Sequence, residues 1–166
     1  MRRRLSLALF AGLLAVGVVS APVAASSSNT IADIAIANGN FKTLVSALSC
    51  TGLVPAVSDP NAQLTVFAPT DTAFRKLGLT PRNICWLPKG LLTKILTYHV
   101  APGELFASDV ISAKRIKMLS GLYVFPSVRS SGAYINWYAK ITAPNIDASN
   151  GVIHVIDSVL IPYSFR

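Results

Sequence analysis

The chain has 166 residues, of which 52% are hydrophobic and 13% charged, and its formal net charge is +8. This composition is too apolar for a disordered chain, and the length suits one domain with its own core rather than several. The positive charge favours weak attraction to anionic glycans, envelope polymers or lipid headgroups, although ordinary solubility charge would explain it equally well.

The N-terminal residues have the layout of a secretory signal peptide. A group of arginines precedes an apolar run at residues 5–19, and Val23 and Ala25 are the small residues that a signal peptidase requires. We therefore expect residues 1–25 to be removed, leaving a polar lead at 26–29 and no transmembrane segment. The alternative is an uncleaved anchor, since a run of this length could span a bilayer. Export predicts a secreted, extracellular or periplasmic protein, for which nucleic acid is not an expected partner.

The first part of the mature chain is predicted to be helical, with one short strand. Thr30 suits the N-cap of a first helix. Asn40 suits that of a second helix, whose apolar residues recur at i, i+3, i+4 and i+7. Residues 64–68 are then predicted to form a strand that Pro69 ends, because proline cannot donate to a central ladder.

Two further helices are expected after this strand. Thr70 or Asp71 is placed to cap a brief helix that carries Phe74. Pro88 suits the first turn of the next helix, because its missing amide proton is not needed there. Pro and Gly at residues 102–103 should end that helical unit.

Beyond residue 103 the apolar residues occur in short runs between turn residues, which predicts strands. The candidates are residues 116–119, 122–125, 134–138 and 140–142. Asn150 and Gly151 give the strongest turn signal, because a tight hairpin needs positive φ at both central residues. Residues 152–161 are apolar on both alternating faces, so we expect a central strand covered on both sides. Helices followed by strands predict an α+β fold.

Two cysteines, Cys50 and Cys85, follow the leader. An oxidising compartment favours their pairing, and with only two the connectivity is fixed. Two buried free thiols are the alternative. A metal site that adds His99 and His154 is disfavoured, because no two of these residues have a short zinc-like spacing. We accordingly expect a disulfide and no metal or cofactor.

Three segments occur in an order that resembles the fasciclin domain family. They are TVFAPTDTAF at residues 65–74, LTYHV at 96–100 and NGVIHVIDSVLIP at 150–162. The resemblance covers residues 30–162 and leaves 163–166 as a C-terminal tail. It implies an α+β fold in which N-terminal helices pack on a wedge of mostly antiparallel β-strands. It also implies a small exported bacterial protein that acts in adhesion and has no catalytic activity.

Structural roles are expected for the residues that match these motifs: Thr65, Phe67, Pro69, Thr70, Asp71, Phe74, Tyr98, His99, Asn150, Gly151, His154 and Asp157. Thr65 to Phe67 should lie beside the final strand, and the Asp71 carboxylate should bond the first amides of the next helix. Tyr98 and His99 suit burial with one hydrogen bond each. Receptor contact through Tyr98 and His99 is the alternative that the family resemblance implies.

A secreted hydrolase is the remote alternative. The sequence contains neither Gly-x-Ser-x-Gly nor His-Glu-x-x-His. A triad of His154, Asp157 and Ser158 is disfavoured, because adjacent strand residues point to opposite faces. His154 and Ser158, four residues apart on an extended strand, would also lie roughly 13 Å from each other, which is too far for a hydrogen bond.

Binding would need an exposed patch of basic or aromatic side chains. The candidates are Lys114, Arg115, Lys117, Tyr134, Trp137 and Tyr138, which could instead simply cover the sheet. The expected function is adhesion or binding by a monomer, with an extracellular or envelope protein, a glycan or an anionic lipid as partner. An exported structural or stress-related envelope protein without a tight ligand is the alternative.

Overall fold

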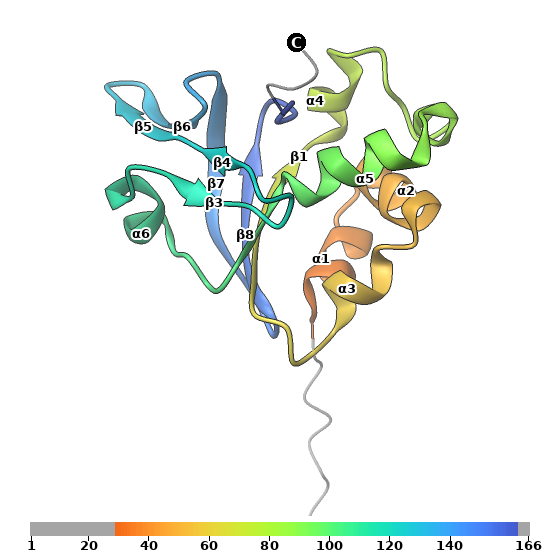
Figure 1. Cartoon of the computed structure of the whole chain (residues 1–166), viewed down its shortest axis with the longest axis horizontal. Helices are drawn as coiled ribbons and strands as arrows, with labels where there is room; N and C mark the ends of the chain where they lie inside the picture. Colours follow the sequence, from red (N-terminus) through yellow and green to blue (C-terminus); the bar gives the residue numbers. More distant parts are fainter. Residues whose placement is uncertain (1–28, 163–166) are drawn as a thin grey trace, which may run out of the picture.

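The computed structural model describes residues 29–162 (Figure 1). The predicted signal peptide, most of the polar lead and the C-terminal tail therefore lie outside the described residues. A six-stranded sheet with strand order β2-β1-β8-β7-β6-β5 forms the centre of the fold. Its strands are β1 (Leu64–Pro69), β2 (Val100–Pro102), β5 (Pro126–Arg129), β6 (Gly132–Ile135), β7 (Ala139–Ala148) and β8 (Gly151–Ile156). A separate two-stranded hairpin consists of β3 (Ile116–Lys117) and β4 (Tyr123–Val124).

Helices cover this sheet unevenly. They are α1 (Ile31–Ala37), α2 (Lys42–Thr51), α3 (Val54–Ser58), α4 (Asp71–Arg75), the 3-10 helix η1 (Ile84–Trp86), α5 (Lys89–Thr97) and α6 (Ala107–Ser112). Figure 1 shows α1, α2, α3 and α5 together on one side of β1 and β8, with α6 on the other side near β3. Among the described strands only β1 and β8 pair in parallel. The predicted α+β class, with helices on a mostly antiparallel wedge, is confirmed.

The central sheet separates two hydrophobic cores. Val66 and Ala68 of β1 join the core under the helices, whereas Phe67 between them joins the core toward the β3–β4 hairpin. Alternate residues of a strand point to opposite faces, which explains this division. Every residue of β8 is buried, and β8 lies between β1 and β7. The predicted central strand is thus present, but it ends at Ile156 rather than at residue 161.

The caps of the helices differ in part from the sequence prediction. Thr30 caps α1 as expected, and Asp33 completes a capping box by accepting from the Thr30 amide at 2.9 Å. Asn40 does not cap α2, so that prediction was wrong. The Asp71 carboxylate accepts from the Thr43 amide at 2.7 Å and from the Lys42 amide at 3.3 Å instead. Asp71 was expected to bond the first amides of the helix that follows it, and that prediction was also wrong, because the fold brings its carboxylate to the start of α2.

Several elements carry no clear sequence signal. The sequence prediction omitted α3, α6, β2 and β5, and it gave β7 only three of its residues. The predicted strand at 134–138 stops at Ile135, because Asn136 and Trp137 have positive φ angles of 50° and 65°. The predicted strands at 116–119 and 122–125 shorten to two residues each.

The hairpin between β7 and β8 forms where it was expected, but its turn lies one residue earlier. Ala148 pairs with Gly151, which leaves Ser149 and Asn150 as the central residues. Asn150 has no positive φ, so its predicted backbone role was wrong. Its buried amide group instead accepts from the Ile31 amide at 2.8 Å and donates to the Val57 and Asp59 carbonyls at 3.0 Å. This one side chain joins α1, α3 and the hairpin.

Candidate functional site

Exposed rings and cations gather on the outer side of the β3–β4 hairpin. Lys117 and Tyr123 are directly opposite each other in the hairpin register and both are exposed. Their neighbours Ile116 and Val124 point inward and are buried. The Arg115 guanidinium lies 4.5 Å from the centre of the Tyr123 ring, close enough for a cation–π contact. Alternation along the two strands thus places Arg115, Lys117 and Tyr123 on one surface.

Trp137 extends this surface. Its indole stacks on Phe125, two residues beyond Tyr123, with ring centroids 5.8 Å apart and planes inclined by 8°. The Trp137 side chain is 52% exposed. Its backbone has φ 65°, a left-handed conformation that costs roughly 1–2 kcal/mol for a residue other than glycine. We call Arg115, Lys117, Tyr123, Phe125 and Trp137 the aromatic–basic face.

A buried polar network holds this face in place. The Asn136 amide donates to the Phe125 carbonyl at 2.8 Å, and the Asn136 side-chain oxygen accepts from the Phe125 amide at 2.9 Å. The fully buried Tyr98 hydroxyl accepts from Asn136 Nδ2 and donates to the Tyr123 carbonyl, each at 3.0 Å. Tyr98 therefore contributes no surface of its own but positions both parts of the face.

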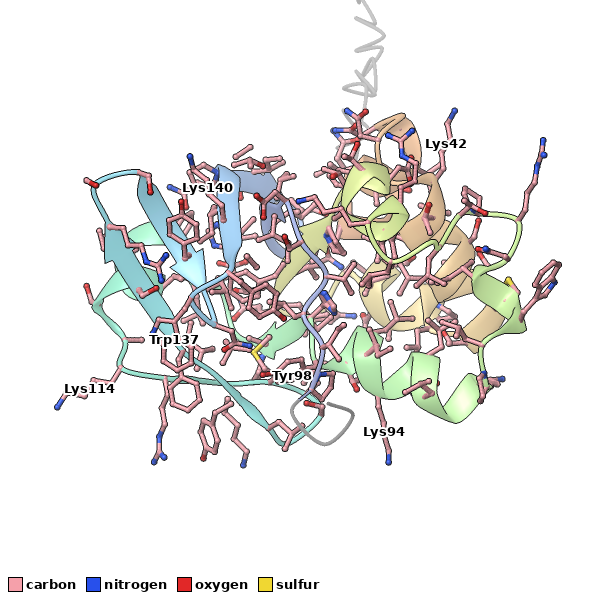
Figure 2. All side chains as sticks on the ribbon, turned by 90° about the horizontal axis from the view of Figure 1, so that it is seen from above. Lys42, Lys94, Tyr98, Lys114, Trp137 and Lys140 are labelled. Atoms are coloured by element: carbon pink, nitrogen blue, oxygen red, sulfur yellow. A yellow bond between two sulfur atoms is a disulfide. The ribbon has the colours of Figure 1, made fainter. Side chains whose placement is uncertain are left out.

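The electrostatic surroundings of this face are positive. Residues 110–146 contain five basic side chains and no acidic one. Figure 2 shows Lys94, Lys114 and Trp137 along the same edge of the molecule. Lys114 is exposed beside Arg115. Such a surface attracts anions, and the attraction weakens as salt is added.

The structure brings together only part of the predicted binding residues. Arg115 and Lys117 flank Tyr123, Lys114 is exposed next to Arg115, and Trp137 joins this surface through Phe125. Tyr134 instead contacts Arg129 in the β5–β6 hairpin. Tyr138 is half-buried and anchors the end of the chain, because its hydroxyl donates to the Val159 carbonyl and accepts from the Ile161 amide. Sequence reasoning missed Tyr123 and Phe125. The available signal was that Tyr123 and Phe125 are two residues apart and follow shortly after the basic residues Lys114, Arg115 and Lys117.

The remaining motif residues lie mainly inside the fold. The Thr65 hydroxyl donates to the Gly103 carbonyl at 2.7 Å and accepts from the Leu105 amide at 2.8 Å. Thr70 caps α4, Pro69 ends β1 and Phe74 is buried in the core under the helices. The side chain of Asp157, just after β8, accepts from the Lys140 amide at 3.0 Å.

Both histidines are buried and neutral. His99 Nδ1 donates to the Ile95 carbonyl and Nε2 accepts from the Leu160 amide, each at 2.8 Å. Burial lowers the pKa of His99 from 6.5 to about 4. His154 stacks on Phe67 and bonds the Leu105 carbonyl at 2.8 Å, and burial lowers its pKa as well. Within residues 29–162, no three His, Cys, Asp or Glu side chains are arranged to hold a metal ion.

Acid is expected to destabilise the protein through His99. The unfolded chain takes up this proton near pH 6.5 and the folded chain near pH 4, so stability is lost as the pH falls from 6.5 toward 4. The free energy of unfolding should decrease by about 2 kcal/mol between pH 7 and pH 5 from this group alone. Urea denaturation of the wild type and of His99→Gln at both pH values tests this. The variant should show the smaller decrease, and equal decreases would contradict the assignment.

The residues of the disfavoured triad are not arranged for catalysis. Ser158 does donate to the Asp157 carboxylate at 2.9 Å, so these neighbours are closer than strand alternation predicts, because β8 has already ended. The His154 ring nitrogens, however, bond the Leu105 carbonyl and the Asn145 amide. His154 therefore has no ring nitrogen left to accept a proton from Ser158.

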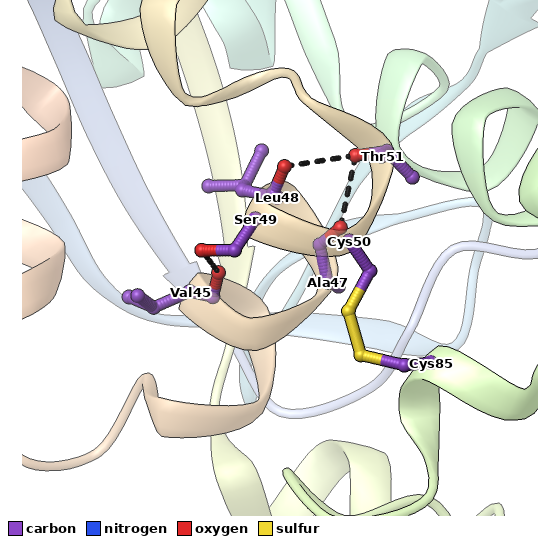
Figure 3. Close-up of a disulfide and its surroundings, with 7 residues drawn as sticks. All are labelled: Val45, Ala47, Leu48, Ser49, Cys50, Thr51 and Cys85. Atoms are coloured by element: carbon purple, nitrogen blue, oxygen red, sulfur yellow. Dashed lines mark hydrogen bonds between the residues drawn. A yellow bond between two sulfur atoms is a disulfide. The ribbon is translucent and has the colours of Figure 1, made fainter.

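The predicted disulfide is confirmed. Cys50 near the end of α2 is bonded to Cys85 in η1, and the structure describes no free cysteine (Figure 3). The last turn of α2 is reinforced next to it, because the Thr51 hydroxyl donates to the Ala47 and Leu48 carbonyls at 2.9 and 3.0 Å. The bond fastens the loop that carries η1 to the helical layer.

Comparison with known proteins identifies the class to which this α+β domain belongs. The Fasciclin domain model matches residues 39–162, so the chain belongs to the fasciclin domain family. It is 40% identical over 146 residues to protein sll1483 of Synechocystis, which covers 87% of this chain and 79% of that protein. It is 32% identical over 149 residues to immunogenic protein MPT70 of Mycobacterium tuberculosis, covering 88% and 72% of the two chains.

Animal relatives are longer. The chain is 33% identical over 133 residues to transforming growth factor-beta-induced protein ig-h3 of Sus scrofa, but it spans only 19% of that protein. The solved FAS1 domain pair of the insect cell adhesion molecule fasciclin I superimposes with a TM-score of 0.69 at 18% identity. That match covers 82% of this chain and 52% of the other, and it supports the fold alone. None of the helices in the described part is long and apolar enough to cross a membrane.

Proposed function

We propose that the protein is an exported, non-catalytic fasciclin domain that binds an anionic partner at the cell envelope or outside the cell through its aromatic–basic face. The exposure of Trp137 carries this proposal. A bulky residue with positive φ is unfavourable, yet Asn136 and Tyr98 hold Trp137 in that conformation with its ring in solvent. Backbone strain that a buried network maintains is typical of functional positions.

Export is supported by the leader and by the disulfide. Disulfides persist in oxidising compartments and are rare in the bacterial cytosol. Fractionation of the host, followed by mass measurement of the N-terminus, tests export, and the expected mature protein begins at Ser26. Recovery of the unprocessed chain from the cytoplasm would contradict this part of the proposal.

Binding can be measured at the face itself, because the chain has only two tryptophans, Trp86 and Trp137. Trp86→Phe leaves Trp137 as the only indole, and Trp137→Phe leaves the distant Trp86 as a matched control. We expect dextran sulfate or anionic vesicles to shift the emission of Trp137 and to leave that of Trp86 unchanged.

A charge-matched pair of variants tests whether the cations of the face bring about this binding. Arg115→Gln with Lys117→Gln should weaken binding about thirtyfold, since each of the two cations contributes on the order of 1 kcal/mol at an anionic surface. Arg82→Gln with Lys89→Gln removes the same charge from exposed positions elsewhere and should have a smaller effect. If no anionic probe shifts Trp137, a structural protein without a ligand becomes the better description.

A further inference from the structure

We infer that the partner of the aromatic–basic face is an anionic lipid surface, onto which the β3–β4 hairpin docks with Leu119 and Leu122 foremost. This inference rests on the proposed function and names its partner. Leu119 and Leu122 form the tip of the hairpin and are 50% and 43% exposed. Two large apolar side chains at an exposed turn are unfavourable in water but are suited to the boundary between headgroups and acyl chains.

Backbone hydrogen bonds close the turn at the tip and fasten it to the rest of the fold. The Met118 amide donates to the Leu122 carbonyl at 2.8 Å and closes the turn. The Leu119 amide donates to the Val100 carbonyl at 2.8 Å, and the Ser120 amide donates to the Thr97 carbonyl at 3.2 Å. These bonds fasten the turn to the end of α5 and to β2. The backbone of the turn therefore needs no ordering when the leucines meet a surface.

Side chains behind the tip follow the order of a membrane interface. Lys117 and Tyr123 form the next cross-strand pair, and Arg115 and the stacked Trp137 lie behind them. Tyrosine and tryptophan favour the headgroup level, and arginine and lysine favour the lipid phosphates. With no acidic residue at positions 110–146, nothing in this segment repels an anionic bilayer.

A soluble polysaccharide fits the same face less completely. It could stack on Trp137 and pair with Arg115 and Lys117, but it would leave Leu119 and Leu122 in water. A bilayer accommodates the leucines, the rings and the cations together. The exposed Trp86, by contrast, has no stacked ring among the described residues, and the leucines nearest Arg82 and Lys89 in sequence, Leu79, Leu87 and Leu91, are only partly exposed.

Sedimentation with vesicles tests the inference, using phosphatidylcholine alone and phosphatidylcholine mixed with phosphatidylglycerol. The wild-type protein should bind the anionic vesicles and not the neutral ones, and salt should weaken the binding. Leu119→Ser with Leu122→Ser should reduce the affinity about tenfold or more, because membrane affinity follows the apolar area inserted. Leu77→Ser with Ile36→Ser is the matched control at two other exposed apolar residues, and it should bind as the wild type does.

Folding must be separated from binding, since Leu119 also lines a shallow apolar pocket beside Leu96 and Val100. Leu122→Ser alone is outside that pocket and should lose affinity while melting as the wild type does. Equal vesicle binding by the tip variants and the control would overturn the inference. If dextran sulfate shifts Trp137 and vesicles do not, the lipid inference fails and the proposed function stands. If neither probe shifts Trp137, both fail.

Discussion

Gly151→Ala is expected to destabilise the protein more than alanine at any other glycine of residues 29–162. Gly151 begins β8 with φ 146°, and a β-carbon there would collide with the carbonyl oxygen of Leu64 in the paired strand β1. The carbonyl carbon and the amide nitrogen of Leu64 would also lie only 2.8 and 2.9 Å away. Because these are backbone atoms of the central ladder, they cannot turn aside as a flexible side chain would.

The expected result is a decrease of about 3 kcal/mol or more in the free energy of unfolding, the upper range for forcing extra volume into a packed interior. Urea denaturation of purified protein measures this. Gly90→Ala, in the first turn of α5, is the control, because a β-carbon there meets nothing within 4 Å and alanine favours a helix. The urea midpoint of Gly90→Ala should equal or exceed that of the wild type. A midpoint for Gly151→Ala equal to that of the wild type would contradict the close approach of β1 and β8.

Removal of the Cys50–Cys85 bond has the second large expected effect. The bond closes a loop of 35 residues, and the chain-entropy treatment assigns such a loop about 4 kcal/mol of stabilisation. A domain of this size has roughly 5–15 kcal/mol in total, so the reduced protein should be only marginally stable. Cys50→Ser with Cys85→Ser should lower the urea midpoint strongly.

Reductant provides the control for the disulfide prediction. It should destabilise the wild type to the level of the double serine variant and leave that variant unchanged. If the serine variant is as stable as the oxidised wild type, the bond does not stabilise the domain. A reductant effect on the serine variant would indicate a cause other than this disulfide.

The sequence was sufficient for the order of the main elements, the central position of β8 and the cysteine pairing. It was insufficient where a side chain acts on a distant segment. Asp71 follows the signature of an N-cap, but the helix that it caps precedes it in the chain, and only the tertiary fold brings the two together. Asn150 has a turn-forming sequence, yet its amide is buried against α1 and α3.

The candidate site could be predicted only in part for a related reason. Lys114, Arg115, Lys117 and Trp137 were recognisable as candidates from their side chains alone. Their meeting depends on the β3–β4 register and on the positive φ angles of Asn136 and Trp137, neither of which has a clear local signal. Tyr134 and Tyr138 are close to Trp137 in sequence, but Tyr134 contacts the Arg129 guanidinium and Tyr138 bonds the Val159 carbonyl.

The position of β8 constrains how the chain can acquire its structure. β1 pairs with β8, so the middle of the sheet cannot assemble until the last strand has been synthesised. A partial chain that ends before Gly151 would present the unpaired edge of β1 and an open apolar interior. Pairing between such remote segments is slow and exposes folding intermediates to aggregation. C-terminal truncation should therefore give insoluble material rather than a smaller folded domain.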